Sequence, residues 1–116
     1  MKIKVGMFGF GRTGSVVVKE LIKDSSCELC WVMRKSHAMK GKYASHLLGF
    51  DHAEGKIYSV DDLTPDNYDD FYRDNYVDVI IDFSSSCAVE KYAHAAKYGT
   101  RIVSAISNYD WAQLEQ

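Results

Sequence analysis

Three glycines at a fixed spacing are the feature that most constrains the fold of this chain. They lie in the segment GFGRTG at residues 9–14, which follows the apolar run 3–8 and precedes a helical pattern at 15–23. In a strand–turn–helix unit, the first glycine permits a tight turn, the second lets the backbone approach a pyrophosphate, and the third allows close helix packing. The helix N-terminus then offers unpaired N–H groups to the phosphates. The motif predicts a dinucleotide site, and the alternative is a glycine-rich turn that only connects two packed elements.

Length and composition are typical of one globular unit with a modest core. The chain has 116 residues, of which 47% are apolar and 26% charged, so we expect a single domain over residues 1–116. The formal net charge of -2 provides no field for general binding to nucleic acid or to an acidic membrane surface. No apolar run approaches a membrane span of roughly 20 residues, and the N-terminus lacks a signal-peptide pattern, which predicts a cytoplasmic protein.

Segments with strand and helix patterns alternate along the chain. Strands are expected at residues 3–8, 27–33, 57–60, 77–83 and 101–106. Helices are expected at 15–23, 65–75 with Pro65 in the first position, 87–98, and from 110 onward, with one helical turn near 43–48 in the otherwise irregular stretch 34–55. This alternation predicts an α/β fold, a doubly wound parallel sheet of the Rossmann type.

The end of the second expected strand indicates which cofactor would bind. Ligands of such sheets bind beyond the carboxyl ends of the strands, and an acidic residue about 20 positions after the glycine loop is typical of NAD sites. This chain has Met33, Arg34 and Lys35 there, with no acid. Because a guanidinium and an ammonium suit a 2′-phosphate, the segment favours NADP(H) over NAD(H). The alternative is a solvated basic turn.

The other strand ends carry small polar residues and no recognisable catalytic set. Ser84 and Ser85 follow the fourth strand, and Ser107 and Asn108 follow the fifth. They suit contacts to a ribose or a nicotinamide carboxamide, or serve as helix caps. Asp82 is interpreted as a tether for a neighbouring loop, with a general-base role as the alternative.

Cysteine and histidine spacing indicates neither a disulfide framework nor a metal site. Cys27, Cys30 and Cys87 make an odd count, and we interpret the first two as packing residues, with a redox pair as the alternative. The four histidines lack metal-site spacing. They are His37, His46, His52 and His94.

Three segments together carry a family resemblance. They are GFGRTG at residues 9–14, DVIIDFS at 78–84, and RIVS at 101–104 leading to NYD at 108–110. In order and spacing they resemble the N-terminal nucleotide-binding domain of dihydrodipicolinate reductase, the lysine-pathway enzyme, over essentially the whole chain. The IDFS sequence is the most specific part, because Rossmann domains in general do not require it.

The resemblance assigns roles to individual residues. It implies that Arg12 and Thr13 lie over the pyrophosphate, that Arg34 approaches the 2′-phosphate, and that Phe83 and Ser84 line the nicotinamide side. The family's Gly-Thr-Thr-Gly-Phe segment corresponds to residues 105–109, where only Ser107 keeps the hydroxyl and Tyr109 keeps the ring. The residues predicted to bind the cofactor are Gly9, Gly11, Arg12, Thr13, Gly14, Arg34, Lys35, Phe83, Ser84, Ala105 and Ser107.

The glycine loop and the basic residues after the second strand predict an NADP(H)-binding domain, with NAD(H) as the other candidate cofactor. The resemblance implies that it belongs to a reductase that passes hydride to a cyclic imine. The family's histidine- and lysine-bearing catalytic segment belongs to a second domain, so this chain alone is expected to bind cofactor without turnover. A homo-oligomer is compatible with the sequence. Two alternatives stay open: the first domain of a related amino-acid or amino-ketone dehydrogenase, and a non-catalytic nucleotide-sensing domain.

Overall fold

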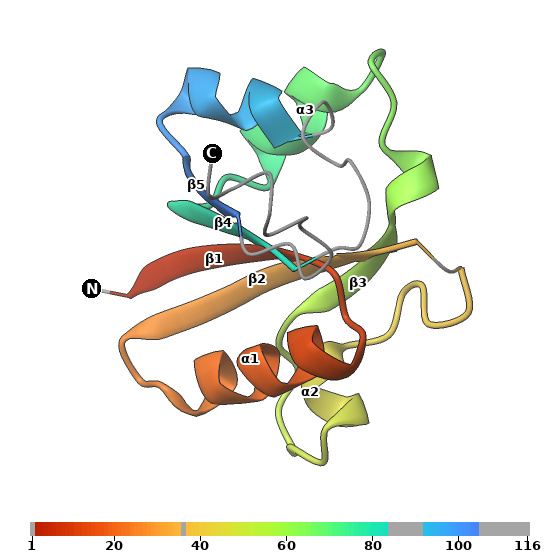
Figure 1. Cartoon of the computed structure of the whole chain (residues 1–116), viewed down its shortest axis with the longest axis vertical. Helices are drawn as coiled ribbons and strands as arrows, with labels where there is room; N and C mark the ends of the chain where they lie inside the picture. Colours follow the sequence, from red (N-terminus) through yellow and green to blue (C-terminus); the bar gives the residue numbers. More distant parts are fainter. Residues whose placement is uncertain (1, 36, 84–91, 105–116) are drawn as a thin grey trace, which may run out of the picture.

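A parallel β-sheet with helices on both faces forms the framework of the molecule (Figure 1). The computed structural model describes residues 2–35, 37–83 and 92–104. Within them the strands are β1 (Ile3–Phe8), β2 (Cys27–Arg34), β3 (Lys56–Ser59), β4 (Val79–Asp82) and β5 (Arg101–Ser104). The helices are α1 (Arg12–Lys23), α2 (Ala44–Leu47) and α3 (Tyr68–Asp74), and the 3-10 helices are η1 (Val60–Asp62) and η2 (Ala93–Tyr98).

The strand order explains where a ligand would bind. The order is β3-β2-β1-β4-β5, and all four strand pairs are parallel. The chain therefore moves outward from β1 to β3, and then returns to the other side of β1 to form β4 and β5. This reversal between β1 and β4 is the switch point at which open α/β sheets bind their ligands. The predicted Rossmann-type architecture is confirmed.

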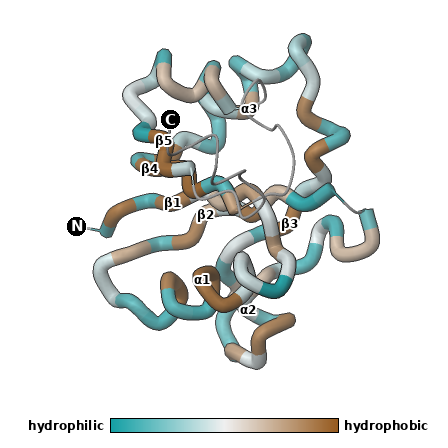
Figure 2. Tube along the Cα trace, viewed as in Figure 1, coloured by the Kyte–Doolittle hydropathy of each residue, from teal (hydrophilic) through white to brown (hydrophobic). Residues whose placement is uncertain are grey.

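The two faces of the sheet bury different kinds of side chain. An aromatic cluster lies under α3 and η2, with Phe8, Trp31 and Tyr72 at its centre. An aliphatic cluster under α1 includes Val18 from the helix and Val32 from β2. Figure 2 shows hydrophobic stretches along the central strands and on α1. With both faces covered, the central strands are buried as expected for a parallel sheet.

Several element boundaries differ from the sequence-based expectations. Helix α1 begins at Arg12 instead of residue 15, because Gly11 is already its N-cap. Helix α3 begins at Tyr68 instead of Pro65, because Asn67 closes a preceding turn: its Oδ1 accepts from the Thr64 N–H at 2.9 Å. Strand β3 ends one residue early because Val60 starts η1.

Other boundaries are close to those expected or fall outside the described ranges. Strand β2 reaches Arg34, and β4 is shorter than the predicted 77–83. The described part of the predicted helix 87–98 is η2, which ends at Gly99 in the left-handed region, with φ of 88°. The predictions for residues 105–106 and 110–116 lie outside the described residues. No helix in the described ranges is long and apolar enough to cross a membrane.

The Cys27–Cys30 pair cannot form a disulfide in this fold. Both residues lie in β2 as free cysteines, three positions apart. That separation places them on opposite faces of the strand and about 10 Å apart, whereas a disulfide needs Cα atoms within about 7 Å. Burial, followed by the nearby Glu28 charge, raises the pKa of Cys30 to about 11. The geometry supports packing residues and not a redox pair.

Candidate dinucleotide-binding site

The carboxyl ends of three strands are joined by backbone hydrogen bonds. The Gly9 N–H donates to the Met33 carbonyl at 2.9 Å, which ties the glycine loop to the end of β2. The Phe83 N–H donates to the Phe8 carbonyl at 2.8 Å, which ties the end of β4 to β1. The glycine loop, Arg34 and Phe83, which are predicted cofactor residues within the described ranges, therefore lie at one edge of the sheet.

The glycine loop, residues 9–14, has two positions where the backbone itself requires glycine. Gly9 has φ of 104°, in the left-handed region that side chains disfavour. Gly14 is buried, and a Cβ there would lie 2.9 Å from the Gly9 carbonyl oxygen. Gly11 differs, because a Cβ there would meet no described atom within 4 Å. Close approach of a ligand therefore explains Gly11 better than packing does.

The start of α1 is suited to an anion. Its N-cap is Gly11, no described side chain caps it, and its first turn contains no acidic residue. The first helical hydrogen bond runs from Ser15 N–H to the Gly11 carbonyl at 2.9 Å. Arg12 and Thr13 lie exposed in this first turn. The N–H groups and the positive end of a 12-residue helix are thus directed toward the sheet edge without a neutralising carboxylate.

Arg34 contacts the glycine loop through an aromatic ring. Its guanidinium carbon lies 5.9 Å from the ring centroid of Phe10, within cation–π range. Phe10 packs in turn on the aliphatic cluster. Arg34 is half-buried and Lys35 exposed, and neither forms a salt bridge with any residue that the structure describes. The two cations at the end of β2 are therefore available to an anion beside the loop.

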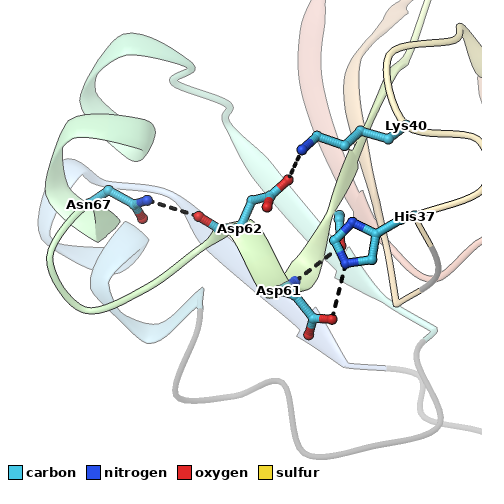
Figure 3. Close-up of polar contacts among 6 residues, drawn as sticks. His37, Lys40, Asp61, Asp62 and Asn67 are labelled. Carbon is cyan, nitrogen blue, oxygen red and sulfur yellow. Dashed lines mark hydrogen bonds and ion pairs between the residues drawn. The ribbon is translucent and has the colours of Figure 1, made fainter.

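A group of ion pairs lies next to these cations and was not predicted from the sequence. His37 Nε2 lies 3.3 Å from Asp61 Oδ2, and Lys40 Nζ is paired with Asp62 (Figure 3). The hydrogen bond from Lys40, followed by the charges of Lys40 and His37, lowers the pKa of Asp62. The sequence signal for this group is a pair of acids, Asp61 and Asp62, directly after the third expected strand.

The structure describes only some of the remaining predicted residues. Phe83 is half-buried at the end of β4 and packs on the aliphatic cluster. Asp82 is fully buried and in register with Phe8 of β1 and Ser104 of β5, which tests neither of its predicted roles. Ser84, Ala105 and Ser107 lie outside the described residues, as do Ser85, Ile106, Asn108 and Tyr109.

Two other histidines lie near carboxylates. His52 Nε2 is 2.7 Å from Glu54 Oε1, and His94 Nδ1 is 3.8 Å from Asp69 Oδ1. Within the described ranges, no group of three His, Cys, Asp or Glu side chains could hold a metal ion.

A separate hollow lies between the end of β3 and α3. Its volume is about 260 Å³, and its floor is apolar, with Met33, Leu63 and Phe71. Asp62, Asp70 and Asp74 are also among its lining residues. The described lining contains no lysine, arginine or histidine, so this hollow is less suited to the phosphate groups of a dinucleotide than the glycine loop is.

Solved structures with the same fold come from dehydrogenases and a repressor. The chain is similar to an amine dehydrogenase from Mycobacterium smegmatis (20% identity, TM-score 0.66), to scyllo-inositol dehydrogenase from Lactobacillus casei with bound NAD(H) and scyllo-inositol (20%, 0.60), and to a Rex-family repressor (13%, 0.64). The matches cover 90%, 90% and 93% of this chain. The chain spans 30%, 28% and 47% of those proteins. At these identities the similarity shows the fold.

Family membership follows from sequence. No curated protein matches the chain. The family model described as dihydrodipicolinate reductase, N-terminus, matches residues 3–116, nearly the whole chain, and confirms the resemblance carried by the glycine loop and the IDFS segment. The chain therefore belongs to the family of dihydrodipicolinate reductase N-terminal domains and is an NAD(P)-binding oxidoreductase domain.

Proposed function

We propose that this chain is the NADP(H)-binding domain of a reductase that transfers hydride to the C=N bond of a cyclic imine, as in dihydrodipicolinate reduction. The observation that carries the choice of cofactor is Arg34. It ends β2 where NAD sites commonly have an acid, it lies over Phe10 of the glycine loop, and no described carboxylate neutralises it. A guanidinium in that position can bind a 2′-phosphate through two hydrogen bonds.

Different groups of the predicted residues would bind different parts of the cofactor. The glycine loop and the α1 N-terminus, with Arg12 and Thr13, would bind the pyrophosphate. Arg34 and Lys35 would bind the adenosine 2′-phosphate. The nicotinamide side would be lined by Phe83, Ser84, Ala105 and Ser107. The bound nicotinamide supplies the hydride, and this chain's residues orient it.

The whole protein's activity is part of the same proposal. In the family, substrate-binding and catalytic groups lie in a second domain, so residues 1–116 would act as one cofactor-binding domain that does not turn over alone. Cytoplasmic location and homo-oligomerisation stay predictions. An assay of the full-length reductase with NADPH and a cyclic imine, against amino-acid substrates, distinguishes this function from that of a related dehydrogenase.

Titration of the chain with NADPH and NADH tests the cofactor assignment. We expect NADPH to bind more tightly, by about tenfold or more, because hydrogen bonds to a charged group contribute about 1.5–3 kcal/mol. Arg34→Ala should remove most of that difference and leave NADH affinity nearly unchanged. Arg101→Ala is the matched control, since Arg101 starts β5 at the opposite edge of the sheet. Equal affinity of the unmodified chain for both cofactors would refute the role of Arg34.

A further inference from the structure

The connection between β2 and β3 is fixed to the outer edge of β3. Gly41 N–H donates to the Ile57 carbonyl at 2.8 Å, and Ile57 N–H donates to the Lys42 carbonyl at 2.8 Å. Tyr43 then forms an antiparallel bridge with Lys56. The chain that leaves Arg34 therefore passes around the carboxyl end of β3 before it follows that strand.

Two ion pairs hold the same connection against η1, as Figure 3 shows. His37 Nε2 lies 3.3 Å both from Asp61 Oδ2 and from the Oγ of buried Ser59. Lys40 Nζ pairs with Asp62. We call His37, Lys40, Asp61 and Asp62 the η1 ion-pair cluster.

The acidic half of the cluster is itself held in place. Ser59 Oγ accepts the Asp61 N–H at 3.3 Å as the N-cap of η1. Asn67 Nδ2 donates to the Asp62 carbonyl at 2.8 Å, which connects η1 to the turn before α3. The carboxylates are thus presented from a backbone anchored on both sides.

The cluster divides the basic residues after β2 into two groups. Arg34, Lys35, His37 and Lys40 lie within seven positions. The last two face carboxylates of η1, while the first two have no ion pair with any described residue. Lys35 is only two positions from His37, so fixing His37 restricts the positions that the Lys35 ammonium can reach. A cation whose position is restricted before binding loses less conformational entropy when it binds a phosphate.

We infer that the η1 ion-pair cluster is a specificity-determining device that positions Arg34 and Lys35 for the 2′-phosphate without contacting the cofactor. The inference rests on the proposed NADP(H) function. Its effect falls on NADPH alone, because NADH has no 2′-phosphate. The four cluster residues are therefore positioning residues, and their loss lowers the ratio of NADPH to NADH affinity.

Charge alone predicts a different outcome, which makes the inference testable. Asp61→Asn/Asp62→Asn removes two negative charges near Arg34, so a field effect would strengthen phosphate binding. His37→Gln/Lys40→Gln removes positive charge, so a field effect would weaken it. Positioning predicts that both double variants lower the affinity ratio, since each breaks the same pairs.

The experiment is calorimetric titration of the unmodified chain and of both double variants with NADPH and NADH at fixed ionic strength. We expect each double variant to lower the affinity ratio by about two- to fivefold, the range that exposed ion pairs provide. NADH affinity should stay within about twofold, which also reports a folded glycine loop. Asp51→Asn/Asp66→Asn is the charge-matched control, because both carboxylates are exposed and neither forms an ion pair with a described residue.

Each outcome of these titrations either supports or overturns the inference. A drop in the ratio for both cluster variants but not for the control supports positioning. An increase for Asp61→Asn/Asp62→Asn, or no change in either cluster variant, overturns it. An unmodified chain without NADPH preference refutes the proposed function itself. If a double variant fails to fold, Lys40→Gln and Asp62→Asn make the same comparison singly, with opposite charge changes.

Discussion

The glycine loop and the connection after β2 are neighbours at the sheet edge, but different forces determine their residues. In the loop, backbone geometry determines which residues fit, because Gly9 has a positive φ and Gly14 lies against the Gly9 carbonyl. In the connection, side-chain charge determines the residues, because Arg34 and Lys35 form no ion pair with any residue in the described ranges, while His37 and Lys40 face carboxylates. Under the proposed function, the first region would control the binding of either dinucleotide, and the second would control the choice between NADPH and NADH.

The largest effect should come from Gly14→Ala, which tests whether the loop acts on both cofactors alike. The added Cβ would lie 2.9 Å from the Gly9 carbonyl oxygen, so α1 must move away from the loop. We expect unfolding free energy to fall by about 1–3 kcal/mol and both affinities to fall together. Urea unfolding and titration measure the two effects.

Gly11→Ala is the matched variant for that test. Its Cβ meets no described atom within 4 Å, so the stability loss should be limited to the weaker N-cap, at most about 1 kcal/mol. Affinity should nevertheless fall for NADPH and NADH alike. A fall in the affinity for NADPH alone would contradict the proposed division of roles between the glycine loop and the connection after β2.

Phe10→Leu should have an intermediate effect and tests the contact that joins the regions. Leucine keeps the apolar packing but loses the ring that lies under the Arg34 guanidinium. A cation–π contact at an exposed site is worth about 0.5–1 kcal/mol, so NADPH affinity should fall about two- to fivefold. NADH affinity should change little in the same titration. Equal losses for both cofactors would show that Phe10 acts only through the loop.

The smallest effect should be a pH dependence of stability at Asp62. Lys40 lowers the folded-state pKa of this carboxyl below its ordinary value of 3.8. The pair therefore stabilises the fold above pH 3.8, and this contribution is lost as the pH falls through the lowered folded-state pKa. Thermal unfolding between about pH 2 and 7 should show a difference between the unmodified chain and Asp62→Asn at neutral pH that shrinks in acid. A constant difference would contradict the ion pair.

The sequence was sufficient for features that depend on local pattern. The alternation of strands and helices predicted the parallel sheet, and it placed the glycine loop after β1 and Arg34 at the end of β2. The contacts of Arg34 with Phe10 and of His37 with Asp61 could not be predicted, because they depend on the path of an irregular connection. The predicted start of α3 at Pro65 was wrong, because the Asn67 side chain closes a turn there and the helix begins only at Tyr68. The cofactor-binding roles of Ser84, Ala105 and Ser107 stay predictions.

Amide chemical-shift mapping of the chain with each cofactor tests the central claim most directly. Both NADH and NADPH should shift the amide resonances of residues 9–14, because both carry the pyrophosphate. Only NADPH should add large shifts at Arg34 and Lys35. Identical maps at these two residues, or a map that leaves the glycine loop unchanged, would contradict the account.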